Sequence, residues 1–178
     1  MLKFLGIAAV ILVIAVAAIL SYAATRPDDF KVSRTATIEA APERILPWIA
    51  DLRQMNEWNP FAKQDPAMKI AYSGPRSGVG AAQDWESSGS GGKGRLEITG
   101  VAEPTSVAMR LDMEKPFEAH NAVAFDLRPN GEATEVTWTM TGGMPFISKV
   151  IGVFVSMDRM IGAEFEQGLA DLKQLAEK

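Results

Sequence analysis

The sequence contains no cysteine and only one histidine, His120, and these two scarcities restrict its chemistry. Without cysteine the chain forms no disulfide and no thiolate metal site, and a lone histidine excludes zinc or copper clusters built from several such ligands. Catalysis by a Ser-His-Asp or Cys-His arrangement would depend on His120, yet no G-x-S-x-G motif occurs. We interpret His120 as a strand residue and expect no metal and no other cofactor.

Basic residues are also in the minority, with 18 Lys and Arg against 22 Asp and Glu among 178 residues. Lys3 is the only charged residue before Arg26, so the rest of the chain is more acidic than the whole. Proteins that bind nucleic acid present a basic face. The composition therefore excludes nucleic acid as an expected partner.

What the chain has in abundance is a leading apolar run. No charge occurs from Phe4 to Ala24, and at about 1.5 Å per helical residue this run covers a hydrocarbon core of roughly 30 Å. We predict a transmembrane anchor over residues 1–25, in contact with the bilayer through residues 4–24, and a linker over residues 26–29. The alternative is a secretory signal peptide, although the run exceeds the roughly 7 to 15 apolar residues usual for one.

The side of the membrane on which the domain lies is less clear from the sequence. Arg26, Lys31 and Arg34 follow the run while only Lys3 precedes it, which favours a cytoplasmic domain. Large domains, however, are translocated largely regardless of flanking charge, and a short basic tail is typical of a signal anchor. We expect a single-pass protein of the bacterial inner membrane with a periplasmic domain, and leave the cytoplasmic orientation open.

Residues 30–178 have the pattern of one α+β domain. Apolar and polar residues alternate in a first strand, Phe30 to Glu39, where Arg34 falls on the apolar face and is expected at a sheet edge or beside an acid. A helix opens at Pro42 and carries an apolar face up to Leu52, and Pro47 within it predicts that it is short or kinked. Six further strands are predicted between turn residues: Met68 to Tyr72, Ala81 to Glu86, Arg95 to Val101, Val107 to Met113, Ala119 to Arg128 and Thr134 to Thr141.

The last segment changes its period. From Phe146 to Lys178 apolar residues recur every three or four positions, which predicts one long amphipathic helix. Such a helix after an antiparallel meander would cover the concave face of the sheet. The expected architecture is a curved seven-stranded antiparallel sheet wrapped on a long C-terminal helix and preceded by one transmembrane helix.

This order of elements resembles the helix-grip fold of the START-like or SRPBCC superfamily, the polyketide cyclase/dehydrase and lipid-transport group. The local motifs that carry the resemblance are Ala41-Pro42-Glu43, Trp58-Asn59-Pro60, Tyr72-Ser73-Gly74, Gly78-Val79-Gly80-Ala81, Thr137-Trp138-Thr139-Met140 and the helix from Gly162 to Lys173. The resemblance covers residues 30–178. It implies a cavity between sheet and helix for sterols, lipids, polyketides or other apolar molecules, and it implies no shared catalytic residues.

Large apolar side chains on the faces expected to turn inward are the candidate ligand-binding residues. They are Trp58, Trp85, Met109, Leu111, Phe125, Trp138, Met140, Phe154, Ile161 and Phe165. The competing interpretation is that these side chains pack against one another and fill the interior, as periodic apolar stripes do in most domains.

Two functions from different classes remain. The first is a membrane-anchored domain that binds a hydrophobic small molecule or lipid. The second is an accessory subunit of a larger membrane complex, docked through small residues of the anchor such as Gly6, Ala9 and Ala15. An enzyme is disfavoured, because acids such as Glu57, Asp65 and Asp84 show no spacing that predicts acid-base chemistry.

Overall fold

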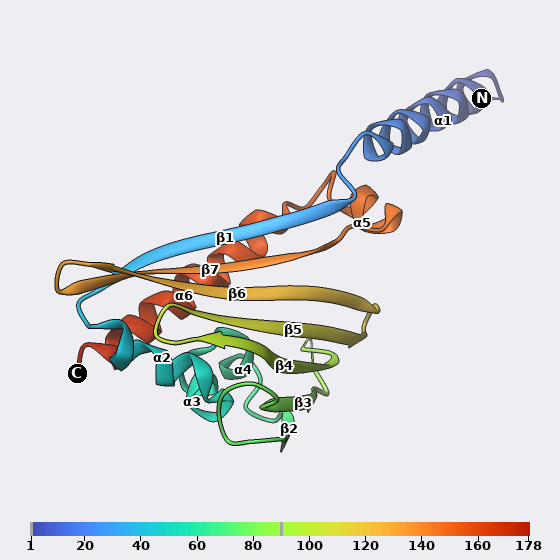
Figure 1. The fold of residues 1–178 in the computed structure, drawn as a ribbon. Helices are drawn as coiled ribbons and strands as arrows, with labels where there is room; N and C mark the ends of the chain where they lie inside the picture. Colours follow the sequence, from blue (N-terminus) through green and yellow to red (C-terminus); the bar gives the residue numbers. More distant parts are fainter. Residues whose placement is uncertain (1, 90) are drawn as a thin grey trace.

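The computed structural model describes residues 2–89 and 91–178 and divides the chain into a projecting helix and an α+β domain (Figure 1). Met1, at the start of the predicted anchor, and Ser90, in the β3–β4 hairpin, lie outside the described residues. The projecting helix, α1 (Leu2–Ala24), contains one stretch, Gly6–Ala24, that is long and apolar enough to cross a membrane. Only 6% of that stretch is buried, and a signal sequence would meet the same criterion.

Seven antiparallel strands form one curved sheet in the order β1-β7-β6-β5-β4-β3-β2. The strands are β1 (Asp29–Ile38), β2 (Lys69–Ser73), β3 (Ala82–Glu86), β4 (Lys93–Ala102), β5 (Ser106–Lys115), β6 (Ala119–Asn130) and β7 (Ala133–Gly143). The prediction of seven strands is confirmed. Strands β2 to β7 form a meander of sequential neighbours, whereas the chain passes from β1 through the helices to β2 at the opposite edge, so that β1 pairs with β7.

Three short helices between β1 and β2 cover one end of the concave face. They are α2 (Pro42–Ala50), α3 (Leu52–Trp58) and α4 (Pro60–Lys63). Asp51 caps α3 by accepting from the backbone N–H of Arg53, and Asn59 caps α4 by accepting from that of Phe61. Such side-chain caps satisfy helix N–H groups that have no partner within the helix.

The C-terminal segment is two helices, so the prediction of one continuous helix from Phe146 is wrong. The short α5 (Phe146–Ile151) ends at Gly152, and the long α6 (Met157–Ala176) begins after Ser156. Ser156 accepts a hydrogen bond from the backbone N–H of Arg159, which fixes a new helix start there. The apolar period continues through the break, which is why the sequence pattern conceals it.

The long helix α6 lies across the concave face and contacts β1 most extensively (Figure 1). Arg34 on β1 binds Asp158 at 2.9 Å and Glu166 at 2.6 Å, both on α6. These acids raise the pKa of the Arg34 guanidinium, with the hydrogen bond to Asp158 as the largest cause. The expectation that Arg34 lies at a sheet edge and is paired with acids is confirmed.

Several segments that are distant in sequence lie together at one end of the sheet. Asp29 pairs with Gly143 there, and Met113 pairs with Ala119, so the start of β1, the end of β7 and the β5–β6 turn lie at the same end. Figure 1 shows the base of α1 and the short helix α5 at this end, with the C-terminus at the other.

Candidate functional site

A cavity of about 1370 Å³ lies between the concave face of the sheet and α6. Its sheet wall includes Trp85, Leu96, Leu111, Met113, Val123, Trp138 and Met140, and its helical wall includes Met55, Phe61, Met157, Ile161 and Phe165. Cavities with this kind of lining suit ligands that bury apolar surface. The alternation along each strand positions the wall, because every second side chain points to the concave face.

An aromatic cluster forms the inner part of this wall. The ring of Trp138 on β7 stacks on that of Phe165 on α6, with centroids 4.0 Å apart and an interplanar angle of 9°. Trp58 meets Trp138 edge-on at 5.5 Å, and Phe125 lies 5.0 Å from it. Sheet, helix α3 and helix α6 therefore meet at Trp138, and the cluster separates the cavity from the packed core behind it.

A few polar groups interrupt the apolar lining. The amide Nδ2 of Asn56 donates to Tyr72 Oη at 3.0 Å and to Gln83 Oε1 at 2.7 Å, and Asn56 and Gln83 both line the cavity. Trp138 is 3% exposed, and its Nε1–H has no partner among the described residues. A buried donor without an acceptor costs stability, and here the Nε1 atom itself is buried within the packed wall.

Residues that follow α1 border the cavity at the end of the sheet where β1 begins and β7 ends. The carbonyl of Asp28 accepts from the backbone N–H of Met144 at 2.6 Å, and its carboxylate binds Lys149 Nζ on α5 at 2.5 Å. The hydrogen bond from Lys149 lowers the pKa of Asp28. Asp28, Met144 and the neighbouring Ser148 all line the cavity, so the segment that links α1 to the domain forms part of its mouth.

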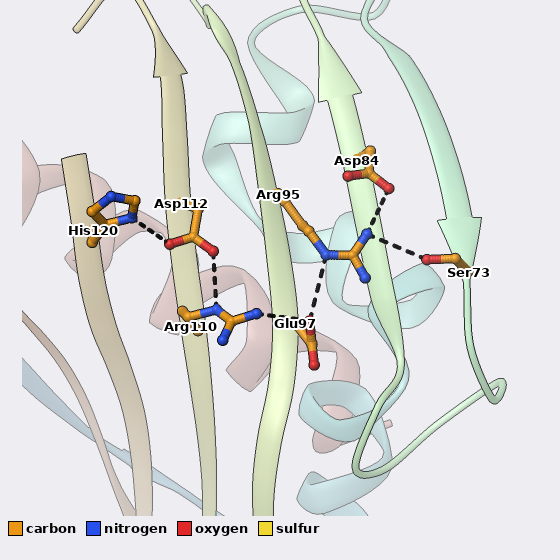
Figure 2. A network of polar contacts seen from close by, with 7 residues as sticks. All are labelled: Ser73, Asp84, Arg95, Glu97, Arg110, Asp112 and His120. Carbon is orange, nitrogen blue, oxygen red and sulfur yellow. Dashed lines mark hydrogen bonds and ion pairs between the residues drawn. The ribbon is translucent and has the colours of Figure 1, made fainter. Parts of the chain in front are cut away.

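The outer, convex face of the sheet carries a chain of alternating charges (Figure 2). Arg95 binds Asp84 at 2.8 Å, Arg110 bridges Glu97 at 3.1 Å and Asp112 at 2.9 Å, and His120 Nδ1 lies 2.7 Å from Asp112 Oδ1. The hydrogen bond to Asp112 raises the pKa of His120. The opposite charges of these exposed side chains on β3 to β6 compensate one another. The ring of His120 lies on this outer face beside Asp112.

The acids considered for a catalytic pair lie in different surroundings. Asp84 belongs to the outer face, whereas Glu57 is exposed on α3. Asp65 lines the cavity and accepts from the hydroxyl of Ser87 and from the backbone N–H of Ala67. No group of three or more metal-binding side chains with suitable positions occurs in the described part of the chain.

The structure separates the ten candidate ligand-binding residues into three groups. Six line the cavity: Trp85, Leu111, Trp138, Met140, Ile161 and Phe165. Trp58, Met109 and Phe125 are at most 2% exposed and belong to the packed core outside the cavity lining. Phe154 lies in the break between α5 and α6, where it is 71% exposed, so its expected position on the inward helix face is wrong.

Sequence reasoning did not identify the residues at the cavity mouth. These include Asp28, Met144, Ile147, Phe117 and Met160, which line the cavity, together with the polar Asn56 and Gln83. Most of them lie in turns or short helices, where no period marks an inward side. The local feature in the sequence that marks this region is the phenylalanine after a proline in Pro116-Phe117, which indicates a large apolar side chain in a turn.

Solved structures share this fold at low sequence identity. Protein CV1439 from Chromobacterium violaceum aligns over 86% of this chain and 99% of its own, with a TM-score of 0.60 and 14% identity. Mll3558 from Rhizobium loti aligns over 83% and 95%, with a TM-score of 0.56 and 21% identity. The major latex-like protein 151 from Panax ginseng aligns over 85% and 100%, with a TM-score of 0.60 and 12% identity.

A comparison with curated proteins gave no match. The family described as polyketide cyclase / dehydrase and lipid transport matches residues 29–177, which span the whole α+β domain. The curved sheet, the helix across its concave face and the cavity between them agree with that match. The chain belongs to the polyketide cyclase/dehydrase and lipid transport family of the SRPBCC superfamily.

Proposed function

We propose that this protein is a membrane-tethered domain that holds a lipid or another hydrophobic small molecule in the cavity between the sheet and α6. The observation that carries the proposal is the cavity of about 1370 Å³ with its mostly apolar wall. A ligand that buries about 300 Å² of apolar surface there gains roughly 7 kcal/mol before the costs of binding are subtracted. Apolar burial is therefore the main favourable term for a ligand in this cavity.

The polar groups of the wall indicate what else the ligand carries. Asn56 and Gln83 line the cavity, and side-chain amides of this kind hydrogen-bond to a carbonyl, carboxyl or hydroxyl group of a ligand. A mainly apolar molecule with at least one polar group therefore suits this wall. Fatty acids, lipids and polyketides all meet this description.

The tether is α1, with the domain at residues 30–178 and residues 26–29 as the linker. The side chains of α1 from Gly6 onward face away from the domain almost entirely, and its apolar length fits a bilayer. This arrangement would keep the cavity beside a membrane that supplies or receives the ligand. We propose a single-pass inner-membrane protein with a periplasmic domain.

A matched pair of substitutions on β5 tests the cavity. Leu111→Arg places a guanidinium in the apolar wall, whereas Ala108→Arg places it at an exposed position of the same strand outside the cavity lining. The full chain in nanodiscs is titrated with pyrene-labelled palmitic acid, and energy transfer from tryptophan to pyrene is measured. Transfer should fall at least tenfold in Leu111→Arg and stay at the wild-type level in Ala108→Arg. Equal transfer in all three proteins would show that the probe resides only in the bilayer and would refute the proposal.

The accessory-subunit alternative makes a different use of α1. Its small residues, among them Gly6, Ala9 and Ala15, would allow another transmembrane helix to approach closely. Under that alternative a C-terminally tagged chain retains a defined partner through mild-detergent purification, and Leu111→Arg leaves its biological role intact. Loss of the role in Leu111→Arg, but not in Ala108→Arg, would favour the binding function.

A further inference from the structure

Large apolar side chains are exposed on α5, on the segment after it and in the β5–β6 turn, and three of them also line the cavity. Phe146, Ile147, Ile151, Phe154 and Val155 lie on α5 and the segment after it, and Phe117 lies in the β5–β6 turn. We call these six residues the apolar rim. Phe117 is 70% exposed and Phe154 is 71% exposed. Soluble proteins seldom expose a contiguous apolar patch of more than a few hundred Å², and larger ones mark interaction sites.

The rim is continuous with the cavity. Phe117, Ile147 and Ile151 belong to the cavity lining and are also exposed to the outside. A molecule that leaves the cavity between them therefore passes over apolar side chains. A surface that covers the apolar rim therefore also covers the entrance to the cavity.

The helix α1 packs against α5, which carries part of the apolar rim, and Ala23 of α1 is fully buried there. Immediately after it, Asp28 binds Lys149 of α5 and the backbone N–H of Met144. The chain thus leaves α1 at Ala24 and reaches the cavity lining at Asp28. If α1 spans a bilayer, its carboxyl end and the rim are at the same membrane surface.

The end of α1 has the side chains expected at such a surface. Tyr22 is exposed, and the Arg26 guanidinium lies 5.9 Å from the centre of its ring. Tyrosine is enriched at both membrane–water interfaces, and long basic side chains near the ends of a transmembrane helix extend to the headgroups. Figure 1 shows α5 directly beside this end of α1.

We infer that the apolar rim docks into the surface of the same bilayer that holds α1, so that the cavity opens into the lipid. The inference rests on the proposed membrane tether and deepens it, because it specifies the source of the ligand. An apolar ligand then moves between bilayer and cavity without exposure to water. The rim residues lose their contact with water in this state, which favours docking at about 25 cal/mol per Å².

The absence of cysteine from the chain allows a direct test. Phe154→Cys and Phe117→Cys place single labels on the rim, Glu132→Cys places one in the turn at the opposite end of the sheet, and Leu12→Cys places one within α1. Each full-length variant is labelled with an NBD fluorophore and reconstituted into vesicles of phosphatidylcholine and phosphatidylglycerol at about 3:1. Quenching is measured with lipids that carry a nitroxide near the headgroup, with lipids that carry one on the acyl chain, and with aqueous iodide.

The two rim labels should be quenched by the lipid nitroxide and protected several-fold from iodide, and the label at position 132 should show the reverse. If the rim labels behave like position 132 while the label at position 12 is quenched by lipid, the rim does not dock and the tether alone stands. If the label at position 12 is also open to iodide, the tether itself is wrong. Protection from iodide without lipid quenching would mean that protein covers the rim, and it would overturn the inference.

Discussion

A substitution at Gly168 tests how closely α6 packs against Trp138 in the wall of the cavity. A Cβ atom built on Gly168 would lie 2.8 Å from Cζ3 of Trp138 and 2.9 Å from Cδ of Pro60. Carbon atoms in contact are normally about 3.5 to 4.0 Å apart. Gly168→Ala must therefore move the helix, the indole ring or Pro60 by several tenths of an ångström.

Two effects of this substitution oppose each other. Overpacking a core contact costs roughly 1 to 3 kcal/mol, whereas alanine is favoured over glycine within a helix by about 1 kcal/mol. We expect a net loss of about 1 kcal/mol in the free energy of unfolding. With a slope of about 2 kcal/mol per molar urea, the midpoint should fall by roughly 0.5 M.

The assay is urea unfolding of the full chain in a mild detergent, followed by near-ultraviolet circular dichroism of the tryptophans. Ala170→Gly, at an exposed position of the same helix, calibrates the helix preference alone. Adding Trp138→Phe removes the atom that the new methyl group meets, so the double variant should recover about 1 kcal/mol relative to additivity. If Gly168→Ala instead raises the midpoint by as much as Ala170→Gly lowers it, the close approach described here is wrong.

Two further predictions concern single side chains. Because Asp112 raises the pKa of His120 above its ordinary 6.5, this pair stabilises the fold fully below pH 6.5 and loses its contribution as pH rises through the folded pKa. The single histidine resonance should titrate above 6.5 in the wild type and closer to 6.5 in Asp112→Asn, and an unchanged midpoint in that variant would contradict the assignment. Gln83→Met removes an amide that lines the cavity, so affinity for a fatty acid should fall about 2- to 12-fold, the equivalent of one hydrogen bond, relative to that for an alkane of equal length. Isothermal titration of both probes gives this ratio, and an equal change for the two would refute a ligand hydrogen bond.

The strands could be predicted closely because their side chains alternate. Val107, Met109 and Leu111 indicate one inward face of β5 from the sequence alone, and the structure places them there. The pattern does not say how far along the strand the cavity begins. Met109 is buried in the core while Leu111 lines the cavity, and the helix that packs against β5 is α2.

The C-terminal helix shows the opposite case, in which a regular pattern misleads. The apolar spacing from Val150 to Ile161 is helical throughout, and only Gly152 and the cap at Ser156 mark the interruption. Local propensities at two residues decided the break, and the tertiary position of α5 beside α1 decided which side chains became exposed. Neither effect is readable from hydrophobic periodicity.

The volume enclosed by the sheet and α6 has a thermodynamic consequence for anyone who handles this protein. Side chains along a cavity of about 1370 Å³ lack the neighbours that would otherwise hold them, so a guest that enters supplies missing packing to the native state only. At a free concentration 100 times its dissociation constant, such a guest adds about 2.7 kcal/mol to the resistance against denaturation. Melting temperature in a screen of candidate metabolites is therefore a direct readout of occupancy, and preparations from different hosts should melt differently according to what they carry.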